Sequence, residues 1–363
     1  MSIRPRRSLS NPELLRPSAL NSVPRDPDRL WLDKNENLDP VLMALAREVL
    51  LDIPPVALAS YPEAGELYRK LARWVGVSPE CLFLTPGSDG AIRSAFEAFV
   101  EHGDGVIHTV PTFAMYPVYS RMFGAQACPI EYERTDTGPR LDPAAIIKAL
   151  RERKPKLLCL PNPDSPTGTT LSPDALREVL AECEAAGTVL LLDEAYYPFY
   201  EWSAVPWTQA SRNLIVARTF AKAWGAAGLR IGYAVAHRET IVLLHKMRPM
   251  YEVSTIAVEF MSRMMDKSFQ MAQAVARINE GKVFFIEEMR ALGFRVLPTA
   301  GNFAHVAFGE LGPALHAALS NKVLYRTASN HPCLAGYSRF TVAPRAIMAQ
   351  VVDLIKRVVE NRS

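Results

Sequence analysis

A single lysine, Lys222, lies in the small and apolar stretch TFAKAWGAAGLRIGY, which runs from Thr219 to Tyr233. Arg230 follows it eight residues later. A lysine at the end of a buried strand can form a Schiff base, because desolvation lowers the pKa of its amine and frees the lone pair. Taken alone, the residue is more simply interpreted as a surface lysine on a loop, so its chemistry depends on what accompanies it.

Two further stretches contain groups that would complement such an amine. Asp193 ends the apolar run of LLLDEAYY, where an unpaired carboxylate is unfavourable, and a protonated pyridine nitrogen is one cation that could pair with it. The turn LTPGSDG, residues 84–90, follows one predicted strand and opens a helix, so its backbone N–H groups can bind a phosphate. Arg230 could add a fixed positive charge to that phosphate. Lysine, aspartate, phosphate turn and arginine are together the groups that pyridoxal phosphate requires.

The segments that carry these residues alternate between two patterns. Short apolar runs typical of β-strands are CLFLTPG, GVIHTVP, KLLCLPNP, TVLLLDEAYY, NLIVARTF and IGYAVA. Helical patterns between them include DGAIRSAFEAFVEHG, DPAAIIKALRERK and SPDALREVLAECEAAG. This alternation predicts an α/β fold whose largely parallel sheet is covered by helices on both faces. Ligands bind such sheets at the carboxyl ends of the strands, where nearly all candidate residues fall.

The pattern changes near Ile241, where long helices begin. The chain then ends in three short apolar runs, GFRVLP, NFAHVAF and SRFTVAP, followed by the helical pattern RAIMAQVVDLIKRVVE. We therefore predict an extended Pro- and Arg-rich arm over residues 1–30, a large domain over 31–245 and a smaller α+β domain over 246–363. Within the large domain, residues 31–50 are expected to be able to pack with the smaller one.

The composition argues against several other classes of protein. The net charge of +3 comes from 41 basic and 38 acidic side chains in a mixed distribution, which does not favour binding to nucleic acid. The chain has no HExxH or GxxxxGK[ST] motif and no GxGxxG after its first predicted strand. Its seven histidines show no metal-ligand spacing, so we expect no metal.

The same composition bears on location. No apolar run reaches the roughly 18 residues that cross a bilayer, and the basic N-terminus lacks the apolar core of a secretory signal. The five cysteines contain no CxxC pair, which suits a reducing compartment. We expect a cytoplasmic protein with no membrane association.

Nine segments, in order, make the sequence similar to a known family. It resembles fold-type I, class I and II aminotransferases, and within them most closely the histidinol-phosphate aminotransferases. The segments are LDKNENLDP, SYPEAGELYRKLA, LTPGSDGAI, PTFAMYPVY, PNPDSPTGT, LLLDEAYYPF, RTFAKAWGAAGLRIGY, AGNFAHVAF and SRFTVAP. The resemblance runs from about Trp31 to the C-terminus. It implies a large domain with a mostly parallel mixed sheet, a smaller α+β C-terminal domain, and pyridoxal 5′-phosphate as the cofactor.

The resemblance also implies roles for individual residues toward the cofactor. Lys222 would bond covalently to its aldehyde, Asp193 would pair with the pyridine nitrogen, and Tyr196 would hydrogen-bond the ring hydroxyl oxygen. Phe113 would stack on the ring; its alternative interpretation is an ordinary core aromatic. The residues implied at the cofactor phosphate are Ser88, Asp89, Thr219 and Arg230.

Four more residues are implied at the substrate or the partner subunit. Arg339 would bind the α-carboxylate of the substrate, Arg326 its phosphate or other anion, and Asn35 would lie near the substrate entrance. Tyr61 would reach the cofactor phosphate of the other subunit, so a homodimer with a shared active site is implied. Alternative interpretations are a surface turn residue for Tyr61, an ion-pair partner for Arg339 and a surface residue at a strand end for Arg326.

Two positions depart from the family pattern. Ser165 stands where the family usually has an asparagine that shares the ring hydroxyl oxygen with the tyrosine, and a serine hydroxyl is shorter and donates one hydrogen bond. Asp164 could compensate only through a backbone change. Ala221 stands where close relatives often have a serine at the phosphate. Both departures indicate a divergent member whose substrate can differ from histidinol phosphate.

The implied reaction is transamination between an amino acid, for which glutamate is the expected donor, and a small anionic or phosphorylated amine or keto acceptor. A phospho-amino-acid decarboxylase is the alternative, because it shares this fold and nearly all these residues. A non-catalytic protein of the same fold is the other class, but a binding module would not need the Schiff-base lysine.

Overall fold

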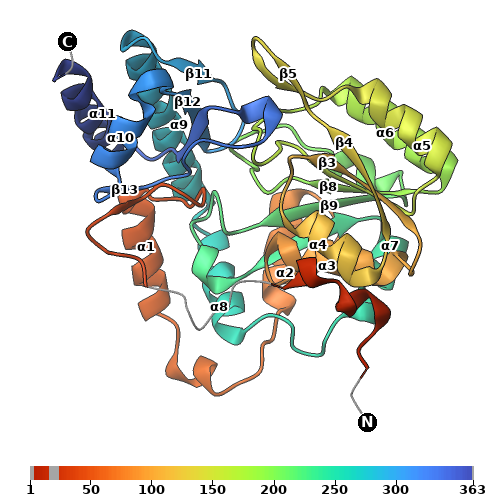
Figure 1. Cartoon of the computed structure of the whole chain (residues 1–363). Coiled ribbons are helices and arrows are strands. Elements are labelled where there is room, and N and C mark those ends of the chain that lie inside the picture. The colour runs from red at the N-terminus through yellow and green to blue at the C-terminus, as the bar shows by residue number, and fades with distance from the viewer. Residues whose placement is uncertain (1–3, 16–23, 362–363) are drawn as a thin grey trace.

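The computed structural model describes residues 4–15 and 24–361. At its centre is a seven-stranded sheet with the order β2-β10-β9-β8-β7-β3-β4 (Figure 1). In chain order the strands are β2 (Leu82–Thr85), β3 (Gly105–Val110), β4 (Gln126–Glu131), β7 (Leu157–Pro161), β8 (Val189–Asp193), β9 (Leu214–Thr219) and β10 (Gly232–Ala236). Within this sheet β10 runs antiparallel to β2 and β9, and the other pairs are parallel. The predicted α/β class with a mostly parallel mixed sheet is confirmed.

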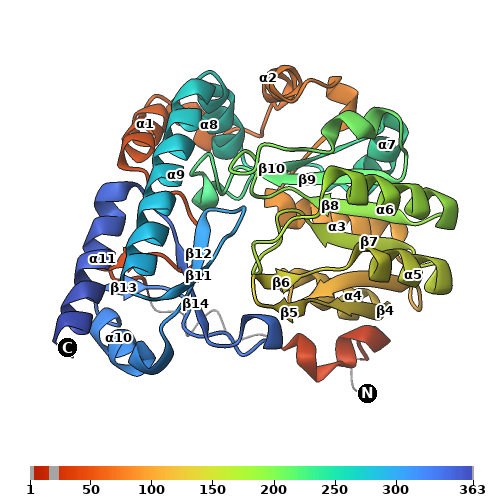
Figure 2. The same ribbon diagram turned by 90° about the horizontal axis from the view of Figure 1, so that it is seen from above.

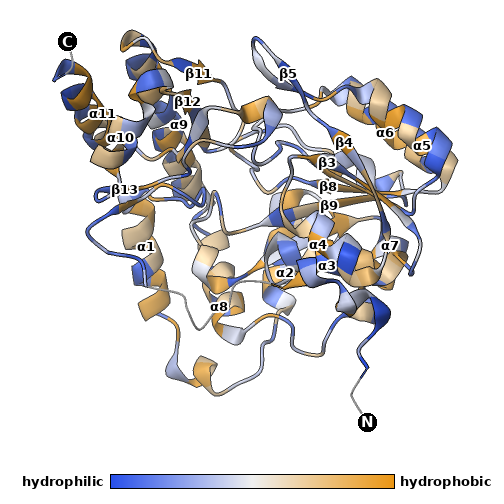
Figure 3. Cartoon of the chain, viewed as in Figure 1, coloured by the Kyte–Doolittle hydropathy of each residue, from blue (hydrophilic) through white to orange (hydrophobic). Residues whose placement is uncertain are grey.

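Apolar side chains alternate between the two faces of this sheet, and helices cover both. Leu190 and Leu192 of β8 belong to one core cluster, and Leu191 belongs to the other. The Leu191 side packs against α3 (Gly87–Phe99), α4 (Met115–Phe123) and α7 (Arg238–Met247), and the opposite side against α5 (Pro143–Arg153) and α6 (Pro173–Ala186) (Figure 1). The central strands are strongly hydrophobic in Figure 3. A strand buried on both faces needs such a continuous apolar run.

A smaller sheet lies beside the large one, as Figure 2 shows. It contains β11 (Arg295–Leu297), β12 (Phe303–Ala307) and β14 (Tyr337–Thr341), all antiparallel. Helices α9 (Ser268–Ala291), α10 (Gly312–Leu319) and α11 (Arg345–Glu360) lie on its side away from the large sheet (Figure 2). A hairpin of β5 (Glu133–Thr135) and β6 (Gly138–Arg140) extends from the large sheet toward it. Among the described residues, no helix is both long and apolar enough to cross a membrane.

The first described segments of the chain contact both the part of the molecule around the large sheet and the part around the smaller sheet. Residues 4–15 form two short 3-10 helices beside α4, where Ser8 donates a hydrogen bond to the Met122 carbonyl at 2.8 Å. Residues 1–3 and 16–23 of the predicted arm lie outside the described residues. Strand β1 (Leu30–Trp31) pairs in parallel with β13 (Val323–Leu324).

The next two helices of the chain contact helices that lie beyond residue 245. Asp39, just before α1 (Pro40–Leu51), forms an ion pair with Arg277 of α9 at 2.7 Å. Helix α2 (Gly65–Val75) contacts α8 (Thr255–Met265). The β1–β13 pairing and the Asp39–Arg277 ion pair support, as a proposal, the predicted packing of residues 31–50 against the smaller domain, and the division near residue 245 stays a prediction.

A buried ion pair joins the ends of the two strands that lead into the site. Glu194 follows β8, and Arg218 precedes the last residue of β9; their side chains are 1% and 5% exposed. Two nitrogens of the Arg218 guanidinium donate to one Glu194 oxygen at 3.0 and 2.8 Å, and the Ala204 backbone N–H donates to the other at 2.7 Å. The guanidinium also lies over the Tyr197 ring, 3.6 Å from its centroid. Both charges are therefore fully satisfied, and the pair fixes the spacing of β8 and β9.

We predict that Glu194→Gln will destabilise the protein strongly, because it leaves the Arg218 charge buried without its partner. Loss of one member of a buried pair lowers the free energy of unfolding by about 3–5 kcal/mol. Urea-induced unfolding measures the change. Glu133→Gln is the matched control, since Glu133 pairs with Arg140 at the surface with exposed fractions of 55% and 66%, and surface pairs contribute about 0–1 kcal/mol. Equal effects of the two substitutions would show that the buried pair has no special part in holding the strands.

Candidate active site

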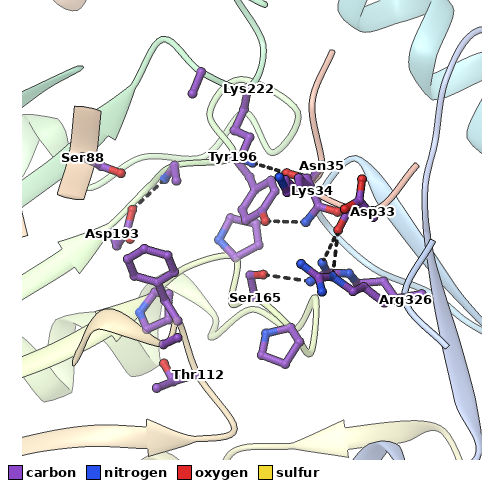
Figure 4. Close-up of a pocket in the computed structure, with 18 of the residues that line it drawn as sticks. Asp33, Lys34, Asn35, Ser88, Thr112, Ser165, Asp193, Tyr196, Lys222 and Arg326 are labelled. Atoms are coloured by element: carbon purple, nitrogen blue, oxygen red, sulfur yellow. Dashed lines mark hydrogen bonds between the residues drawn. The ribbon is translucent and has the colours of Figure 1, made fainter. Parts of the chain in front are cut away.

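A cavity of about 580 Å³ opens between the carboxyl ends of β7, β8 and β9 and the smaller sheet. Side chains from widely separated parts of the chain point into it, as the labelled residues of Figure 4 show. All the predicted site residues line it except Tyr61. They are Asn35, Ser88, Asp89, Phe113, Ser165, Asp193, Tyr196, Thr219, Lys222, Arg230, Arg326 and Arg339.

Lys222 extends into this cavity just after β9. Its Nζ donates a hydrogen bond to the Lys34 carbonyl at 2.6 Å (Figure 4). Burial, helped by the positive charge of Arg339, lowers the pKa of this amine to about 8. An amine with such a pKa has an appreciable neutral fraction near physiological pH, so it can act as a nucleophile or as a general base.

Asp193 is buried at the end of β8 with 5% exposure. One carboxylate oxygen accepts from the Tyr116 hydroxyl at 2.9 Å, and the other accepts from the Ala195 backbone N–H at 3.0 Å. Burial raises the pKa of this carboxyl to about 6, although the Tyr116 hydrogen bond opposes the shift. Asp193 forms no ion pair within the described part of the chain. The carboxylate is therefore placed to receive a cation that the chain does not supply.

The turn between β2 and α3 forms a concave backbone surface beside Arg230. Gly87 has a φ of +76°, and a Cβ there would lie 2.9 Å from an Arg230 guanidinium nitrogen. Gly232 packs against the same turn, where an added Cβ would be 2.7 Å from the Ser88 backbone nitrogen. Glycine is required at position 87 by its positive φ and at position 232 because a Cβ there would collide with backbone atoms. The N-terminus of α3 and the arginine together make an anion site.

A chain of hydrogen bonds connects Tyr196 to the smaller sheet. Asn35, whose φ is +56°, donates from its side-chain amide to the Tyr196 hydroxyl at 2.7 Å. The Asn35 backbone N–H donates to the Thr341 hydroxyl at 2.8 Å. Arg339 donates to the Ser165 hydroxyl at 3.3 Å. Ser165, which stands in place of the usual asparagine, is thus within hydrogen-bonding reach of Arg339.

Two arginines lie opposite each other on this side of the cavity. Arg326 and Arg339 form an antiparallel bridge, and their guanidinium groups both donate to the Asp33 carbonyl, at 3.2 and 3.0 Å. Opposed residues of an antiparallel pair project to the same side, so the two positive charges share one region. Neither has a carboxylate partner among the described residues. Burial lowers the pKa of Arg339, and Arg326 contributes to that shift.

Sequence reasoning missed several residues that line the cavity or contact its lining. Tyr116 was not singled out, although it lies in PTFAMYPVY, because nothing in that segment shows that its hydroxyl reaches Asp193. Asp33 and Lys34 contribute backbone carbonyls, which no side-chain pattern can indicate. Asp164, which the sequence suggested only as a compensation for Ser165, is fully buried, and burial raises the pKa of its carboxyl to about 7. His305 lines the cavity from β12.

Tyr61 lies apart from this cavity on the surface of its own chain. Its side chain is 71% exposed and stacks on Tyr251, with ring centroids 4.1 Å apart. The implied role of Tyr61 concerns a second subunit and stays a prediction.

These observations fit pyridoxal phosphate. The buried Asp193 carboxylate without a cation suits a pyridine nitrogen, the α3 turn with Arg230 suits a phosphate, and the amine of Lys222 suits an aldehyde. The described residues contain no group of three or more His, Cys, Asp or Glu side chains that could hold a metal ion.

We predict that Asp193→Asn will stabilise the cofactor-free protein at alkaline pH. The folded pKa is raised from 3.8 to about 6, so the stability that the protonated carboxyl contributes is complete near pH 4 and is lost as the pH rises through 6. The variant should exceed wild type by up to about 3 kcal/mol at pH 8 and match it near pH 4. Urea unfolding at pH 4, 6 and 8 measures this difference. Asp353→Asn, at an exposed position of α11, is the control, and a similar pH dependence in both variants would contradict the prediction.

Comparison with known proteins places this site in a family. The family model "Aminotransferase class I and II" matches residues 27–357. A histidinol-phosphate aminotransferase of Thermoanaerobacter sp. is 32% identical over 324 residues, covering 87% of this chain and 89% of the relative. Another, from Caldanaerobacter subterraneus, is 30% identical over 297 residues, covering 82% and 83%.

Solved structures share the fold. A putative histidinol-phosphate aminotransferase of Erwinia carotovora atroseptica superposes with a TM-score of 0.81 at 24% identity, covering 92% of this chain and 97% of that one. The enzyme of Sinorhizobium meliloti in complex with pyridoxal-5′-phosphate gives 0.76 at 24% identity, covering 92% of each chain. The chain therefore belongs to the class I and II aminotransferases and is a pyridoxal-phosphate-dependent enzyme of that family.

Proposed function

We propose that this aminotransferase moves an amino group between glutamate and a small phosphorylated or otherwise anionic amine, in the manner of a histidinol-phosphate aminotransferase. The observation that carries the proposal is the pair Arg326 and Arg339, bridged across two backbone segments in one cavity. Two guanidinium groups without carboxylate partners can bind two separate anionic groups or one dianion. The relatives named above as histidinol-phosphate aminotransferases support a phosphorylated substrate.

Arg339 and Arg326 would have different tasks. Arg339 is the more enclosed of the two and lies next to Tyr196 and Ser165, so it is suited to the α-carboxylate of a donor such as glutamate. Arg326 also lines the cavity but is more exposed, so it is suited to a phosphate or a side-chain carboxylate. Asn35, between them and Tyr196, would line the substrate entrance. Ping-pong exchange of two anionic substrates at one site is consistent with this arrangement.

The other residues would hold the cofactor. The phosphate would lie between Arg230, Thr219, Ser88 and Asp89, and the pyridine nitrogen would pair with Asp193. Phe113 would stack on the ring, while Tyr196 and Ser165 would contact its hydroxyl oxygen. Pyridoxal phosphate, when bound, supplies an aldehyde for the substrate amine and a ring that accepts electrons from the α-carbon.

Lys222 is the residue suited to proton transfer at the α-carbon. With a pKa lowered to about 8, its amine can hold a proton or release it near neutral pH. Tyr116 and the Ala195 backbone N–H hold the Asp193 carboxylate in one orientation. Such a set of groups exceeds what a non-catalytic binding protein needs, so we favour an active enzyme.

The protein is further proposed to be a cytoplasmic homodimer with a shared active site. Exposed apolar side chains near Tyr61 support the dimer, because a monomer would leave them in water; they are Val56, Leu58, Met250 and Tyr251. The five cysteines are all free thiols, which supports a reducing compartment.

We predict that phosphorylated amino compounds will be better substrates than neutral amines of similar size, and that Arg326→Gln will remove this preference. A charge-assisted arginine contact contributes about 1.5–3 kcal/mol, so the Michaelis constant for the anionic substrate should rise by roughly one to two orders of magnitude. Neutral substrates should change little. Steady-state kinetics on one anionic and one neutral amine, with assays of keto product and carbon dioxide, measure both effects.

The control for this experiment is Arg290→Gln, at an exposed position near the end of α9 and outside the cavity. Equal losses on both substrates, or none, would remove Arg326 from substrate recognition. Release of carbon dioxide without a keto product would replace transamination by the alternative reaction, decarboxylation of a phospho-amino acid.

The shared site is tested by mixing two inactive variants. If Tyr61 acts in the partner subunit, Tyr61→Ala and Lys222→Ala should recover partial activity when their subunits exchange, because one site of the heterodimer then has both residues. Asp193→Asn mixed with Lys222→Ala should stay inactive, since both of these residues belong to one chain's cavity. Proven exchange without recovery in the first mixture would mean that Tyr61 acts within its own chain or not at all.

A further inference from the structure

The turn that carries Ser165 connects the large sheet to the smaller one. Residues 162–168 follow β7, and three hydrogen bonds from the smaller body reach them. The His305 ring donates from Nε2 to the Pro166 carbonyl at 2.7 Å, Arg339 donates to Ser165 at 3.3 Å, and the Ala300 backbone N–H donates to the Gly168 carbonyl at 2.9 Å. The position of the turn is therefore set partly from outside its own domain.

The loop that reaches Gly168 is itself anchored by a lysine. Lys282 of α9 donates from Nζ to the Gly301 carbonyl at 2.7 Å and also to the Thr299 carbonyl. Because this loop is held separately, the contact at Gly168 does not depend on His305. The His305 bond is the one that acts nearest to Ser165, since Pro166 is the next residue.

Ser165 depends on the turn more than a longer residue would. A serine hydroxyl is one bond from Cβ, so its place is fixed by the backbone and by one torsion angle. Its contact with Arg339, at 3.3 Å, is close to the limit of a useful hydrogen bond. A small shift of the turn would break it. The amide of an asparagine, by contrast, could reach across such a shift.

Histidine is suited to hold the turn at this place. His305 of β12 lies directly opposite Arg339 of β14 and is 2% exposed. Burial lowers the pKa of its ring to about 4, so the ring is neutral at physiological pH and does not repel Arg339. A lysine or arginine could also donate to the Pro166 carbonyl, but it would place a second positive charge beside the guanidinium. The other ring nitrogen, Nδ1, is buried without a partner among the described residues, as expected when Nε2 carries the proton.

We propose that His305 is a positioning residue: by donating to the Pro166 carbonyl it holds the Ser165 hydroxyl against Arg339 and the cofactor. This inference rests on the proposed function, because it assigns Ser165 to the cofactor and Arg339 to a substrate carboxylate. His305 acts on the site through the turn, by its hydrogen bond to the Pro166 carbonyl. A short residue at position 165 is what makes this support necessary.

The test uses the holoenzyme and two probes, pyridoxal 5′-phosphate and glutarate, a dicarboxylate without an amine. Dissociation constants for both are read from the visible absorbance of the bound cofactor. His305→Phe keeps a ring without a donor, and His305→Asn has an amide too short to reach Pro166. Both should weaken glutarate binding by roughly five- to tenfold, the range for loss of one hydrogen bond. His305→Gln, whose amide can replace Nε2–H, should stay within about twofold of wild type.

The same substitutions in a Ser165→Asn protein separate the positioning of the turn by His305 from a role of His305 in packing alone. With Ser165→Asn, the longer side chain should reach its partners without a fixed turn, so His305→Phe should then weaken glutarate binding by less than about twofold. Wild type and His305→Phe are therefore compared again in Ser165→Asn protein. His108→Phe, at a buried histidine of β3 outside the cavity, should leave both dissociation constants unchanged. If His305→Phe does not fold, His305→Asn takes its place in every comparison.

Each outcome either supports or overturns the positioning role of His305. If His305→Gln weakens glutarate binding as much as His305→Phe and His305→Asn do, the positioning role of His305 is overturned. The same holds if His305→Phe weakens glutarate binding to its full extent in the Ser165→Asn protein as well. If wild type binds pyridoxal phosphate but not glutarate, the same comparisons are made on the cofactor dissociation constant, because Ser165 is placed at the cofactor. Wild-type protein that binds no pyridoxal phosphate would instead contradict the assignment on which the inference rests.

Discussion

A carboxylate buried without a cation of its own is the constraint around which this molecule is arranged. Asp193 ends a fully buried strand, and burial raises its pKa to about 6. Its neighbour Glu194 is equally buried but is paired with Arg218 at 2.8 Å. Two consecutive acidic residues are thus both buried, but only the second has a cation beside it. The paired one fixes the strands, and the unpaired one is left for a ligand to neutralise.

That arrangement explains why the site needs several layers of support. An uncompensated carboxylate destabilises the fold that contains it, so the strands beneath must be stable without the ligand. The apolar runs of β7, β8 and β9 and the Glu194–Arg218 pair supply that stability. Hydrogen bonds from Tyr116 and Ala195 hold the carboxylate in one orientation. A binding site preorganised in this way loses little entropy when the cofactor enters.

Backbone carbonyls have an equally large part on the opposite wall. Lys222, Arg326 and Arg339 all donate to the segment of Asp33 and Lys34. These carbonyls satisfy part of the hydrogen-bonding capacity of three cations without neutralising their charge. The cavity therefore keeps a positive character that suits anionic substrates. The segment itself is held by Asn35 and Thr341, so the N-terminal part of the chain and the smaller sheet form one wall together.

The sequence by itself determined the fold class, the family, the cofactor and all but one of the side chains that it assigned to the cavity. These depend on local information: short continuous apolar runs, a glycine-containing turn before a helix, and short motifs with fixed residue types. It did not reveal Tyr116 at Asp193, the carbonyls of Asp33 and Lys34, or His305 at Pro166, because each is a contact between segments that are distant along the chain. The roles of individual residues and the domain boundaries stay predictions. Only the tertiary structure decided which groups share the cavity, which charges are paired, and how a serine at position 165 meets Arg339, since burial and distance are properties of the packed chain and not of any segment alone.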